Sequence, residues 1–473
     1  MADYHMIING RSVGSDTTFP VINPATEQVI AQCPQGSESD LDSAVVAARA
    51  AFPAWSALPG SERAALVHRI GEAIEANKDE LSRLLTLEQG KPGEGFAGLG
   101  AAFEIGAALA WCHAAADTDL PVDVIQDNEE ARIEVHRKPL GVVASITPWN
   151  YPLMIAVWHV MPALRSGNTV VLKPSEYTPL TTLRFAEIVN EFLPAGVFNV
   201  LAGDGELGAA MTRHTGIDKI VFTGSTATGK KIMQGASVNL KRLTLELGGN
   251  DAAIVMPDVD VNAIAPKIFA TAMFNNGQTC AALKRLYVHE DIYDELCRAL
   301  VAIAESVTTG DGSGDVDFGP VQNKAQFEKV CAMADEARES GARFLVGGEP
   351  MPGPGYFYPV TIVSELDERS RLVQEEPFGP ILPVMKFRDV EDAIARANDN
   401  PSGLGGSVWS GDVKYATELA GRLECGAAWV NGHAAIQPDA PFGGVKQSGF
   451  GVEFGRHGME EYTSIQTLHV SKA

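Results

Sequence analysis

The sequence is poor in basic residues. Its 473 residues include 37 Lys and Arg against 60 Asp and Glu, which gives a formal net charge of −23. Proteins that bind nucleic acid or anionic membrane surfaces carry clustered Lys and Arg, so this balance argues against both kinds of partner. An acidic, solvated surface that keeps the protein soluble is the simpler interpretation.

Cysteine and targeting signals are also scarce. The six cysteines form no C-x-x-C pair, so we expect no disulfide framework, no metal site and a reducing cytoplasmic location. The first ten residues, MADYHMIING, lack the basic and apolar segments of a secretory signal. Residues 140–164 contain no Asp, Glu, Lys or Arg, but prolines at 148, 152 and 162 argue against a membrane span. A buried strand, turn and helix are expected there.

Short apolar runs alternate with helical patterns over most of the chain. Between about residues 140 and 250 the runs are GVVASITPW, TVVLKPSE, VFNVLAG, DKIVFTGS and RLTLELGG. This spacing predicts βαβ units and a parallel sheet, and a second alternating region runs from about 250 to 447. We therefore expect an α/β protein with two such units that meet near residues 246–250. Upstream, residues 38–58 and 61–91 have helical spacing, and the second segment opens on a Ser cap.

Two segments have a different pattern. Residues 116–140 and 461–473 alternate polar and apolar side chains, as solvent-facing antiparallel strands do. They predict a small separate sheet, or arms that reach another subunit.

The segment GDGELG, residues 203–208, matches the G-x-G-x-x-G pattern of dinucleotide-binding turns. That pattern also needs an acidic residue at the end of the next strand, but KIVFTGS ends in Thr223, Gly224 and Ser225. A carboxylate does follow an earlier strand, at Glu176. The segment FTGSTATGKK is a better phosphate site, because Ser225 and the N-terminus of the next helix offer donors. A turn without a ligand stays open for both segments.

Four short motifs carry the chemistry. They are TPWNYP with Asn150, LTLELGGN with Glu246, FNNGQTC with Cys280, and EEPFGP with Glu376 and Phe378. Together with LKPSE and FTGSTATG, in this order, they closely resemble the aldehyde dehydrogenase superfamily. The resemblance runs from INPATEQVIA through LTLEQGKP to APFGGVKQSGFG and so covers nearly the whole chain.

The resemblance implies an architecture. A Rossmann-like NAD-binding domain would comprise residues 1–116 and 138–247, and an α/β catalytic domain residues 248–447. Residues 117–137 and 458–473 would be the strands of a small antiparallel oligomerisation arm in a homodimer or homotetramer.

The resemblance also assigns roles that suit the residue types. Cys280 would attack the aldehyde, because a thiolate forms an adduct and then a thioester that water can hydrolyse. Asn150 and the Cys280 N–H would form an oxyanion hole. Glu246 would be the base that activates water. Relatives that pass the acyl group to coenzyme A typically lack this base, so hydrolysis is favoured.

The expected cofactor is NAD. Lys173 and Glu176 match the positions that hold the adenine ribose, and a carboxylate there repels a 2′-phosphate. NADP stays an alternative, because some relatives with this Glu accept both. Gly205 would border the adenine, and Glu376 and Phe378 would contact the nicotinamide ribose and ring. The full set of expected cofactor contacts is Ile146, Thr147, Trp149, Lys173, Ser175, Glu176, Gly205, Phe222, Gly224, Ser225, Leu247, Glu376 and Phe378.

Two relay residues and a substrate funnel complete the assignment. His159 stands where relatives commonly have a Lys of a proton relay, and Glu453 matches a second relay carboxylate. A packed helix His and a surface Glu are the alternatives. The residues that match the substrate entrance contain no Arg and predict a neutral, hydrophobic, aliphatic or aromatic aldehyde; they are Tyr151, Ile155, Trp158, Phe274, Ile436 and Phe442.

Three rival functions remain. A coenzyme A-acylating dehydrogenase would depend on coenzyme A. A catalytically silent NAD-binding protein would keep the cofactor motifs without turnover, although the set of Cys280, Glu246 and Asn150 counts against it. A thiol hydrolase would not need the cofactor motifs, and the sequence shows no evident Cys–His pairing.

Overall fold

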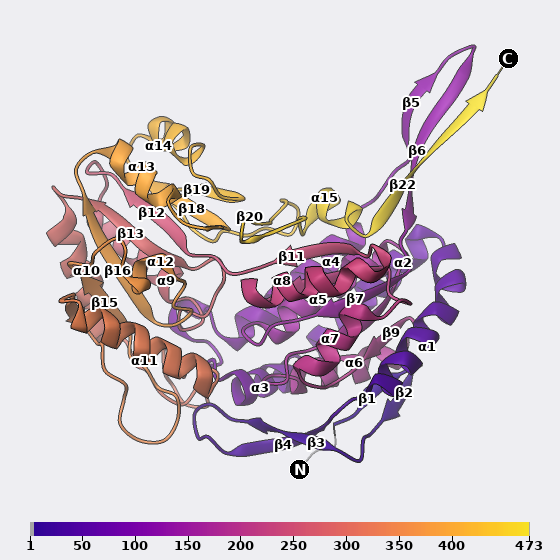
Figure 1. The fold of residues 1–473 in the computed structure, drawn as a ribbon, viewed down its shortest axis with the longest axis horizontal. Coiled ribbons are helices and arrows are strands. Elements are labelled where there is room, and N and C mark those ends of the chain that lie inside the picture. Colours follow the sequence, from indigo (N-terminus) through magenta and orange to yellow (C-terminus); the bar gives the residue numbers. More distant parts are fainter. Residues whose placement is uncertain (1–3, 473) are drawn as a thin grey trace.

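The computed structural model describes residues 4–472, and it is built around two large sheets (Figure 1). The outermost residues of the expected ranges 1–116 and 458–473 therefore lie outside the described residues. The first sheet has eight strands, and β9, β8, β7, β10 and β11 run parallel to one another. In order they are β2 (Arg11–Val13), β1 (Met6–Ile8), β9 (Phe198–Val200), β8 (Thr169–Lys173), β7 (Val142–Ile146), β10 (Lys219–Thr223), β11 (Arg242–Glu246) and β21 (Gly449–Phe450).

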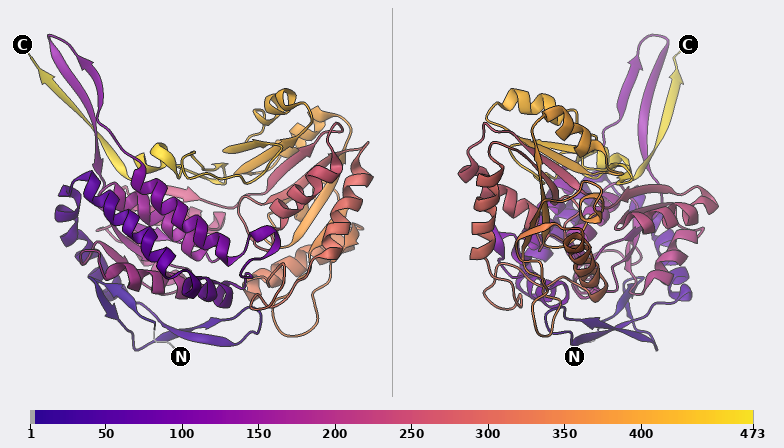
Figure 2. Two further views of the ribbon diagram at one scale, coloured as in Figure 1. Left: turned by 180° about the vertical axis from the view of Figure 1, so that it is seen from behind. Right: turned by 60° about the vertical axis from the view of Figure 1, so that its left-hand side comes forward.

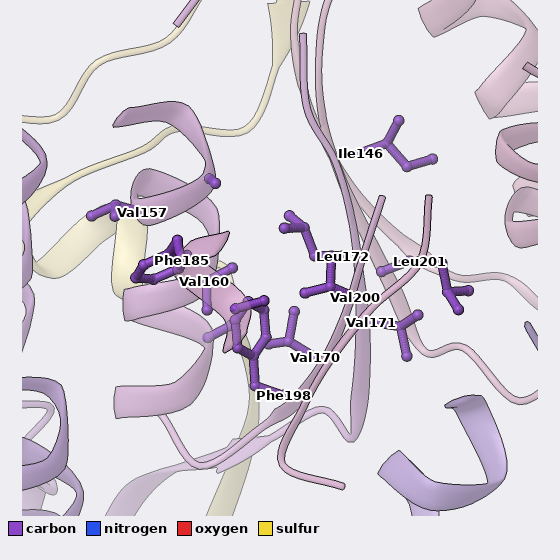
Figure 3. Packing of buried hydrophobic residues seen from close by; sticks show 14 of the residues in the cluster. Ile146, Val157, Val160, Val170, Val171, Leu172, Phe185, Phe198, Val200 and Leu201 are labelled. Atoms are coloured by element: carbon purple, nitrogen blue, oxygen red, sulfur yellow. The ribbon is translucent and has the colours of Figure 1, made fainter. Parts of the chain in front are cut away.

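Eight helices accompany this sheet. They are α1 (Glu38–Ala57), α2 (Gly60–Ala76), α3 (Lys78–Gln89), α4 (Ala101–Asp117), α5 (Pro152–Arg165), α6 (Leu180–Asn190), α7 (Gly205–Arg213) and α8 (Thr226–Ala236). The central strands are buried on both faces, which explains their continuous aliphatic runs. Figure 3 shows Val170 of β8 and Phe198 of β9 packing toward Val160 of α5 and Phe185 of α6. This core fixes the strand ends that carry polar groups.

The expected helix over residues 61–91 is wrong in detail. The structure has two helices there, α2 and α3, and Asn77 separates them. The Asn77 side chain donates to the Ala73 carbonyl and closes α2. The predicted Ser cap is absent as well, because Pro59 precedes α2 and its carbonyl accepts the Glu62 N–H.

The second sheet has seven strands, of which only β14 pairs antiparallel. In order they are β14 (Arg343–Val346), β15 (Thr361–Ser364), β16 (Ile381–Phe387), β13 (Leu283–His289), β12 (Asp251–Val255), β18 (Gly405–Trp409) and β19 (Ala427–Val430). Its helices are α9 (Val261–Met273), α10 (Tyr293–Ser306), α11 (Lys324–Glu339), α12 (Arg371–Gln374), α13 (Val390–Asn398) and α14 (Val413–Ala420). The predicted α/β class, with two parallel-sheet units, is confirmed.

A three-stranded antiparallel arm projects from the body, with the C-terminus at its far end (Figures 1 and 2). It contains β5 (Asp123–Asp127), β6 (Ala131–Pro139) and β22 (Thr463–Ser471). Helix α4 precedes β5, and the short helix α15 (Gly455–Glu460) precedes β22. The first residues of the expected arm ranges 117–137 and 458–473 therefore belong to helices. Two small sheets complete the fold: β3 (Thr18–Ile22) with β4 (Val29–Pro34), and β17 (Ser402–Gly403) with β20 (Val445–Lys446).

Two apolar segments fall within the body of the protein. Residues 140–164 form the buried strand β7 and most of the buried helix α5, as expected. The helical segment Phe96–Asp117, which includes α4, is long and apolar enough for a membrane span by composition. In the fold α4 packs against α2, α3 and α5, the arrangement of a core helix.

Candidate active site

The two sheets are connected at the point where polar residues gather. β11 ends at Glu246, and β12 begins at Asp251. A cavity of about 490 Å³ lies beside this connection and includes the start of α8 in its lining. Eight of the predicted site residues line it: Trp149, Asn150, Gly224, Ser225, Leu247, Cys280, Glu376 and Phe378.

Cys280 lies in a strained loop between α9 and β13. Asn275, Asn276 and Gly277 have φ angles of 52°, 56° and 70°, a run of left-handed conformations that non-glycine residues rarely adopt. Side-chain bonds hold this run, because Asn275 Nδ2 donates to the Asn150 carbonyl at 2.9 Å and Asn276 Nδ2 to the Gly319 carbonyl at 2.9 Å. Burial and the nearby carboxylates Glu376 and Glu246 raise the pKa of the Cys280 thiol, so a neighbouring cation or proton acceptor is needed to generate the thiolate.

Asn150 is buried and its amide faces the Cys280 loop. Its Nδ2 donates to the Gln278 carbonyl at 2.9 Å, two residues before the thiol. An amide nitrogen has two hydrogens, which leaves one for an oxyanion.

A buried ion pair holds the backbone carbonyl of Asn150. The sequence analysis did not identify this pair. Lys91 Nζ lies 2.5 Å from Glu104 Oε2 and donates to the Asn150 carbonyl at 2.9 Å. Glu104 Oε1 accepts the Leu153 N–H at 2.9 Å and the Met154 N–H at 3.2 Å at the start of α5. The sequence feature that could have revealed the pair is Glu104, a charged residue inside the largely apolar pattern of α4.

Glu246 is 4% exposed at the end of β11, and within residues 4–472 neither carboxylate oxygen has a hydrogen-bond partner. Burial and the neighbouring carboxylate of Glu453 raise the pKa of Glu246 well above its ordinary value. A raised pKa makes the ionised carboxylate a stronger base toward water. The role of Glu246 as a base stays a prediction that this environment suits.

His159 and Glu453, the two relay candidates, are both buried and lie together. His159 Nε2 is 3.1 Å from Glu453 Oε1 and 2.9 Å from Thr223 Oγ1, and His159 Nδ1 is 2.9 Å from Ser145 Oγ. The surface position considered for Glu453 is therefore wrong, since its side chain is 3% exposed.

The residues around the cavity fit a dinucleotide. Glu376 is half-buried, its Oε1 has no hydrogen-bond partner within the described chain, and desolvation raises its pKa to about 8 despite Lys329 and Lys284. This orphaned oxygen can accept from ribose hydroxyls. Ser225 caps α8 by accepting the Thr228 N–H, and Thr226 and Ala227 line the cavity, so the helix N-terminus is available to a phosphate. Trp149 and Phe378 meet edge to face at 5.2 Å.

The segment GDGELG offers no comparable phosphate site. Asp204 caps α7 and accepts the N–H groups of Glu206 at 2.9 Å and Leu207 at 3.4 Å, so a carboxylate already occupies the helix N-terminus. Space above Gly205 is open, because a Cβ there would meet nothing within 4 Å. Lys173 Nζ lies 3.7 Å from Glu176 Oε2, which places the two expected ribose contacts side by side.

The remaining expected cofactor contacts are buried near the strand ends. Ile146 ends β7, Thr147 follows it, and Phe222 lies near the end of β10. The Thr147 N–H donates to the Lys173 carbonyl at 3.2 Å. Ser175 accepts the Tyr177 N–H and shapes the turn that carries Glu176.

One aromatic cluster contains all six funnel residues, with Cys280 at its border: Tyr151, Ile155, Trp158, Phe274, Ile436 and Phe442. Sequence reasoning missed Phe103, Trp111 and Phe454, which belong to the same cluster. The ring centroids of Trp158 and Phe454 are 4.7 Å apart, and those of Phe103 and Phe274 are 5.3 Å apart. No motif marks these three residues, because α4 and the segment after β21 reach the cluster only through the tertiary fold.

This site and this fold define the class of protein. The family model described as the aldehyde dehydrogenase family matches residues 12–468, and the chain belongs to that family of oxidoreductases acting on aldehydes. The resemblance found in the motifs is therefore confirmed.

Several relatives match along nearly their whole length. Phenylacetaldehyde dehydrogenase of Pseudomonas fluorescens is 39% identical and covers 99% of this chain and 96% of its own. An NAD⁺ complex of an aldehyde dehydrogenase from Bacillus cereus has a TM-score of 0.96 at 36% identity, covering 99% and 97% of the two chains. An NAD⁺ complex of betaine aldehyde dehydrogenase from Staphylococcus aureus has a TM-score of 0.94 at 34% identity, covering 99% and 94%.

Proposed function

We propose that this protein is an NAD-dependent dehydrogenase that oxidises a neutral, hydrophobic aldehyde to the carboxylic acid. The observation that carries the proposal is the cavity that brings Cys280, Asn150 and Glu376 together beside the start of α8. Similar NAD⁺ complexes support the cofactor, and the NADP alternative is disfavoured by Glu176 beside Lys173.

Cys280 is the proposed nucleophile. Its sulfur adds to the aldehyde carbon, and the free hydrogen of Asn150 Nδ2 together with the Cys280 N–H stabilises the oxygen anion that forms. NAD supplies the hydride acceptor when it is bound. The hydride leaves the carbon, the oxygen anion collapses to a carbonyl, and a thioester remains on Cys280.

Glu246 is the proposed base for the second half of the reaction. Its carboxylate takes one proton from a water molecule, the water oxygen bonds to the thioester carbon, and the carbon–sulfur bond breaks to return the Cys280 thiolate. Glu246 has no competing hydrogen bond among residues 4–472, which supports a water-binding role. His159 and Glu453, at 3.1 Å from each other, are proposed to hold the proton next.

The aromatic cluster supports a hydrophobic substrate. Its buried members, Tyr151, Trp158, Phe442 and Phe454, carry no charge that would bind a second carboxylate. An aryl or long aliphatic aldehyde suits such a lining, and the relative that acts on phenylacetaldehyde points to an arylaldehyde for the first trial.

We further propose a cytoplasmic homo-oligomer, a dimer or a tetramer, formed through the arm of β5, β6 and β22. Ile125 and Ile465 of the arm are 66% and 71% exposed, although isoleucine prefers burial. We propose that a second copy of the chain covers the arm, because exposed apolar side chains and unpaired edge strands are unfavourable in water.

The test is reduced-cofactor formation at 340 nm over a panel of aldehydes, with NAD and NADP compared. We expect turnover with NAD, an arylaldehyde and no coenzyme A, and a Cys280→Ala variant that binds NAD without turnover. Dependence on added coenzyme A would favour the acylating alternative. The complete absence of reduced cofactor with every aldehyde would favour a silent NAD-binding protein.

A further inference from the structure

The cofactor loop, residues 376–379, follows α12 and carries two of the expected contacts to the nicotinamide half of NAD. Helix α11 holds its first three carbonyls: Lys329 Nζ donates to that of Glu376 at 2.7 Å, and Gln326 Nε2 donates to the next two at 2.8 and 3.1 Å. Phe378 has a left-handed φ of 49°, which a non-glycine residue rarely adopts. A strained turn of this kind persists only where its surroundings fix it.

Lys284 of β13 holds the fourth carbonyl of the cofactor loop. Its Nζ donates to the Gly379 carbonyl at 2.9 Å, which also accepts the Ile381 N–H, and to the Ala272 carbonyl at 3.3 Å. Ala272 lies in the last turn of α9, where the helix dipole favours a cation. The Lys284 amine therefore joins three elements: α9, β13 and the cofactor loop.

Lys284 is 0% exposed, and burial of its amine has an energetic cost. Burial lowers the pKa of Lys284 to about 7, although the carboxylates of Glu376 and Asp251 act in the opposite direction. An apolar side chain at this position would avoid that cost. The lysine is therefore better explained by the two carbonyls that its amine holds than by the packing of its aliphatic stem.

The loop that carries Cys280 passes directly against this contact. A Cβ at Gly277 would lie 2.1 Å from the Gly379 oxygen and 2.6 Å from Lys284 Nζ. Only a residue without a side chain fits there, and Gly277 also has a positive φ of 70°. Lys284 itself follows Cys280 by four residues. One side chain thus connects the segment of the proposed nucleophile to the cofactor loop.

The backbone of Gly379 is enclosed on the side of α11 as well. A Cβ at Gly379 would lie 2.5 Å from Val330 Cγ2 of that helix. The cofactor loop is therefore confined between α11, which holds three of its carbonyls, and Lys284 of β13, which holds the fourth. Removal of the Lys284 amine would leave the bonds from α11 and take away the bond that ties the loop to the strand after Cys280.

We propose that Lys284 is a positioning residue that sets the nicotinamide end of the cofactor site at its working distance from the Cys280 sulfur. The inference rests on the proposed function, in which bound NAD accepts a hydride beside Cys280. Lys284 acts through the Gly379 carbonyl and so through the Glu376 carboxylate and the Phe378 ring. A misplacement of about 1 Å can slow a reaction between bound groups by about 10²-fold, so a small shift of this loop is enough to be measured.

The test separates the nicotinamide end of the site from the rest of the protein. Lys284→Met removes the amine and keeps a long apolar side chain. We expect its Kd for NAD to rise at least fivefold and its single-turnover hydride transfer at saturating NAD to slow at least tenfold. Its Kd for ADP, which carries the adenine half alone, should stay within twofold of wild type. Acetylation of Cys280 by p-nitrophenyl acetate, which needs no cofactor, should also stay within twofold.

Lys241→Met is the matched control, because Lys241 is a buried lysine that bonds to Asn239 and lies away from the cofactor loop. It should leave all four quantities unchanged. A purely structural role of Lys284 would instead lower ADP affinity and acetylation together with NAD affinity and hydride transfer.

Three outcomes decide the proposal. Wild-type NAD affinity and hydride transfer in folded Lys284→Met would overturn it, and so would an equal loss of all four quantities. If Lys284→Met does not fold, Lys284→Gln decides. Its amide is one bond shorter and cannot reach both carbonyls, so slower hydride transfer with normal ADP binding is expected, and a wild-type rate would contradict the proposal. Failure of the wild-type protein to bind NAD or to acetylate at Cys280 would instead contradict the proposed function itself.

Discussion

The buried Lys91–Glu104 pair gives the most quantitative prediction about the proposed oxyanion hole. Lys91→Met removes the donor 2.9 Å from the Asn150 carbonyl and leaves Glu104 charged and buried. Loss of one partner of a buried ion pair costs about 3–5 kcal/mol of stability. Displacement of an oxyanion donor costs about 10²–10³ in kcat, so we expect a comparable loss if Asn150 moves.

A double variant separates the two effects. Lys91→Met with Glu104→Gln removes both charges, and the carbonyl oxygen of the introduced glutamine can still accept the Leu153 and Met154 N–H groups. We expect most of the stability to return, measured by thermal melting, while hydride transfer stays slow and NAD affinity is unchanged. Lys78→Met, which breaks an exposed pair with Glu75, is the control and should alter neither quantity. Wild-type kcat/KM in a folded Lys91→Met variant would refute the reasoning.

Three further predictions concern the base, the cofactor and the arm. Glu246→Gln should keep hydride transfer and slow thioester hydrolysis by about 10²–10⁴. The same variant should melt higher than wild type at neutral pH but not at pH 4. The unfolded glutamate ionises near 4.5 and the folded one only at higher pH, so wild-type stability falls as pH rises from the unfolded pKa to the folded pKa. Glu176→Ser should raise the NADP-to-NAD ratio of kcat/KM by about tenfold, equivalent to 1.4 kcal/mol, and an unchanged ratio would remove Glu176 from the ribose site. Ile465→Asp should reduce the mass in light scattering toward the 50.3 kDa protomer, whereas an unchanged mass would place the interface elsewhere.

The sequence motifs predicted the α/β class and the residues at the strand ends, because catalytic groups in such folds follow strands directly. Glu246 at the end of β11 and Asn150 after β7 fit that pattern, whereas Cys280 and Glu376 lie before strands and were predicted from the ordered motifs alone. Asp204 illustrates the opposite case: G-x-G-x-x-G matches the phosphate pattern, but the intervening residue caps the helix with its own carboxylate. A pattern of glycines carries no information about that charge.

The sequence alone could not predict contacts between distant segments of the chain. Lys91 and Asn150 lie 59 residues apart, and only the tertiary fold brings them together. The register of β10 and β11 likewise brings Lys219 beside Thr244, and a shift of one residue would turn Lys219 to the other face. The sequence likewise could not show which groups His159 contacts, because its three partners come from other segments of the chain.

Cys280 carries the acyl group in the proposed mechanism, and trapping that group tests the mechanism most directly. The measurement is acid quenching of the protein within milliseconds of mixing with NAD and phenylacetaldehyde, followed by mass spectrometry of the Cys280 peptide. We predict an added phenylacetyl group on Cys280 in wild type, a larger fraction in Glu246→Gln and none in Cys280→Ala. Formation of phenylacetic acid with Cys280 unmodified at every time in Glu246→Gln, or an acyl group on another cysteine, would contradict the account.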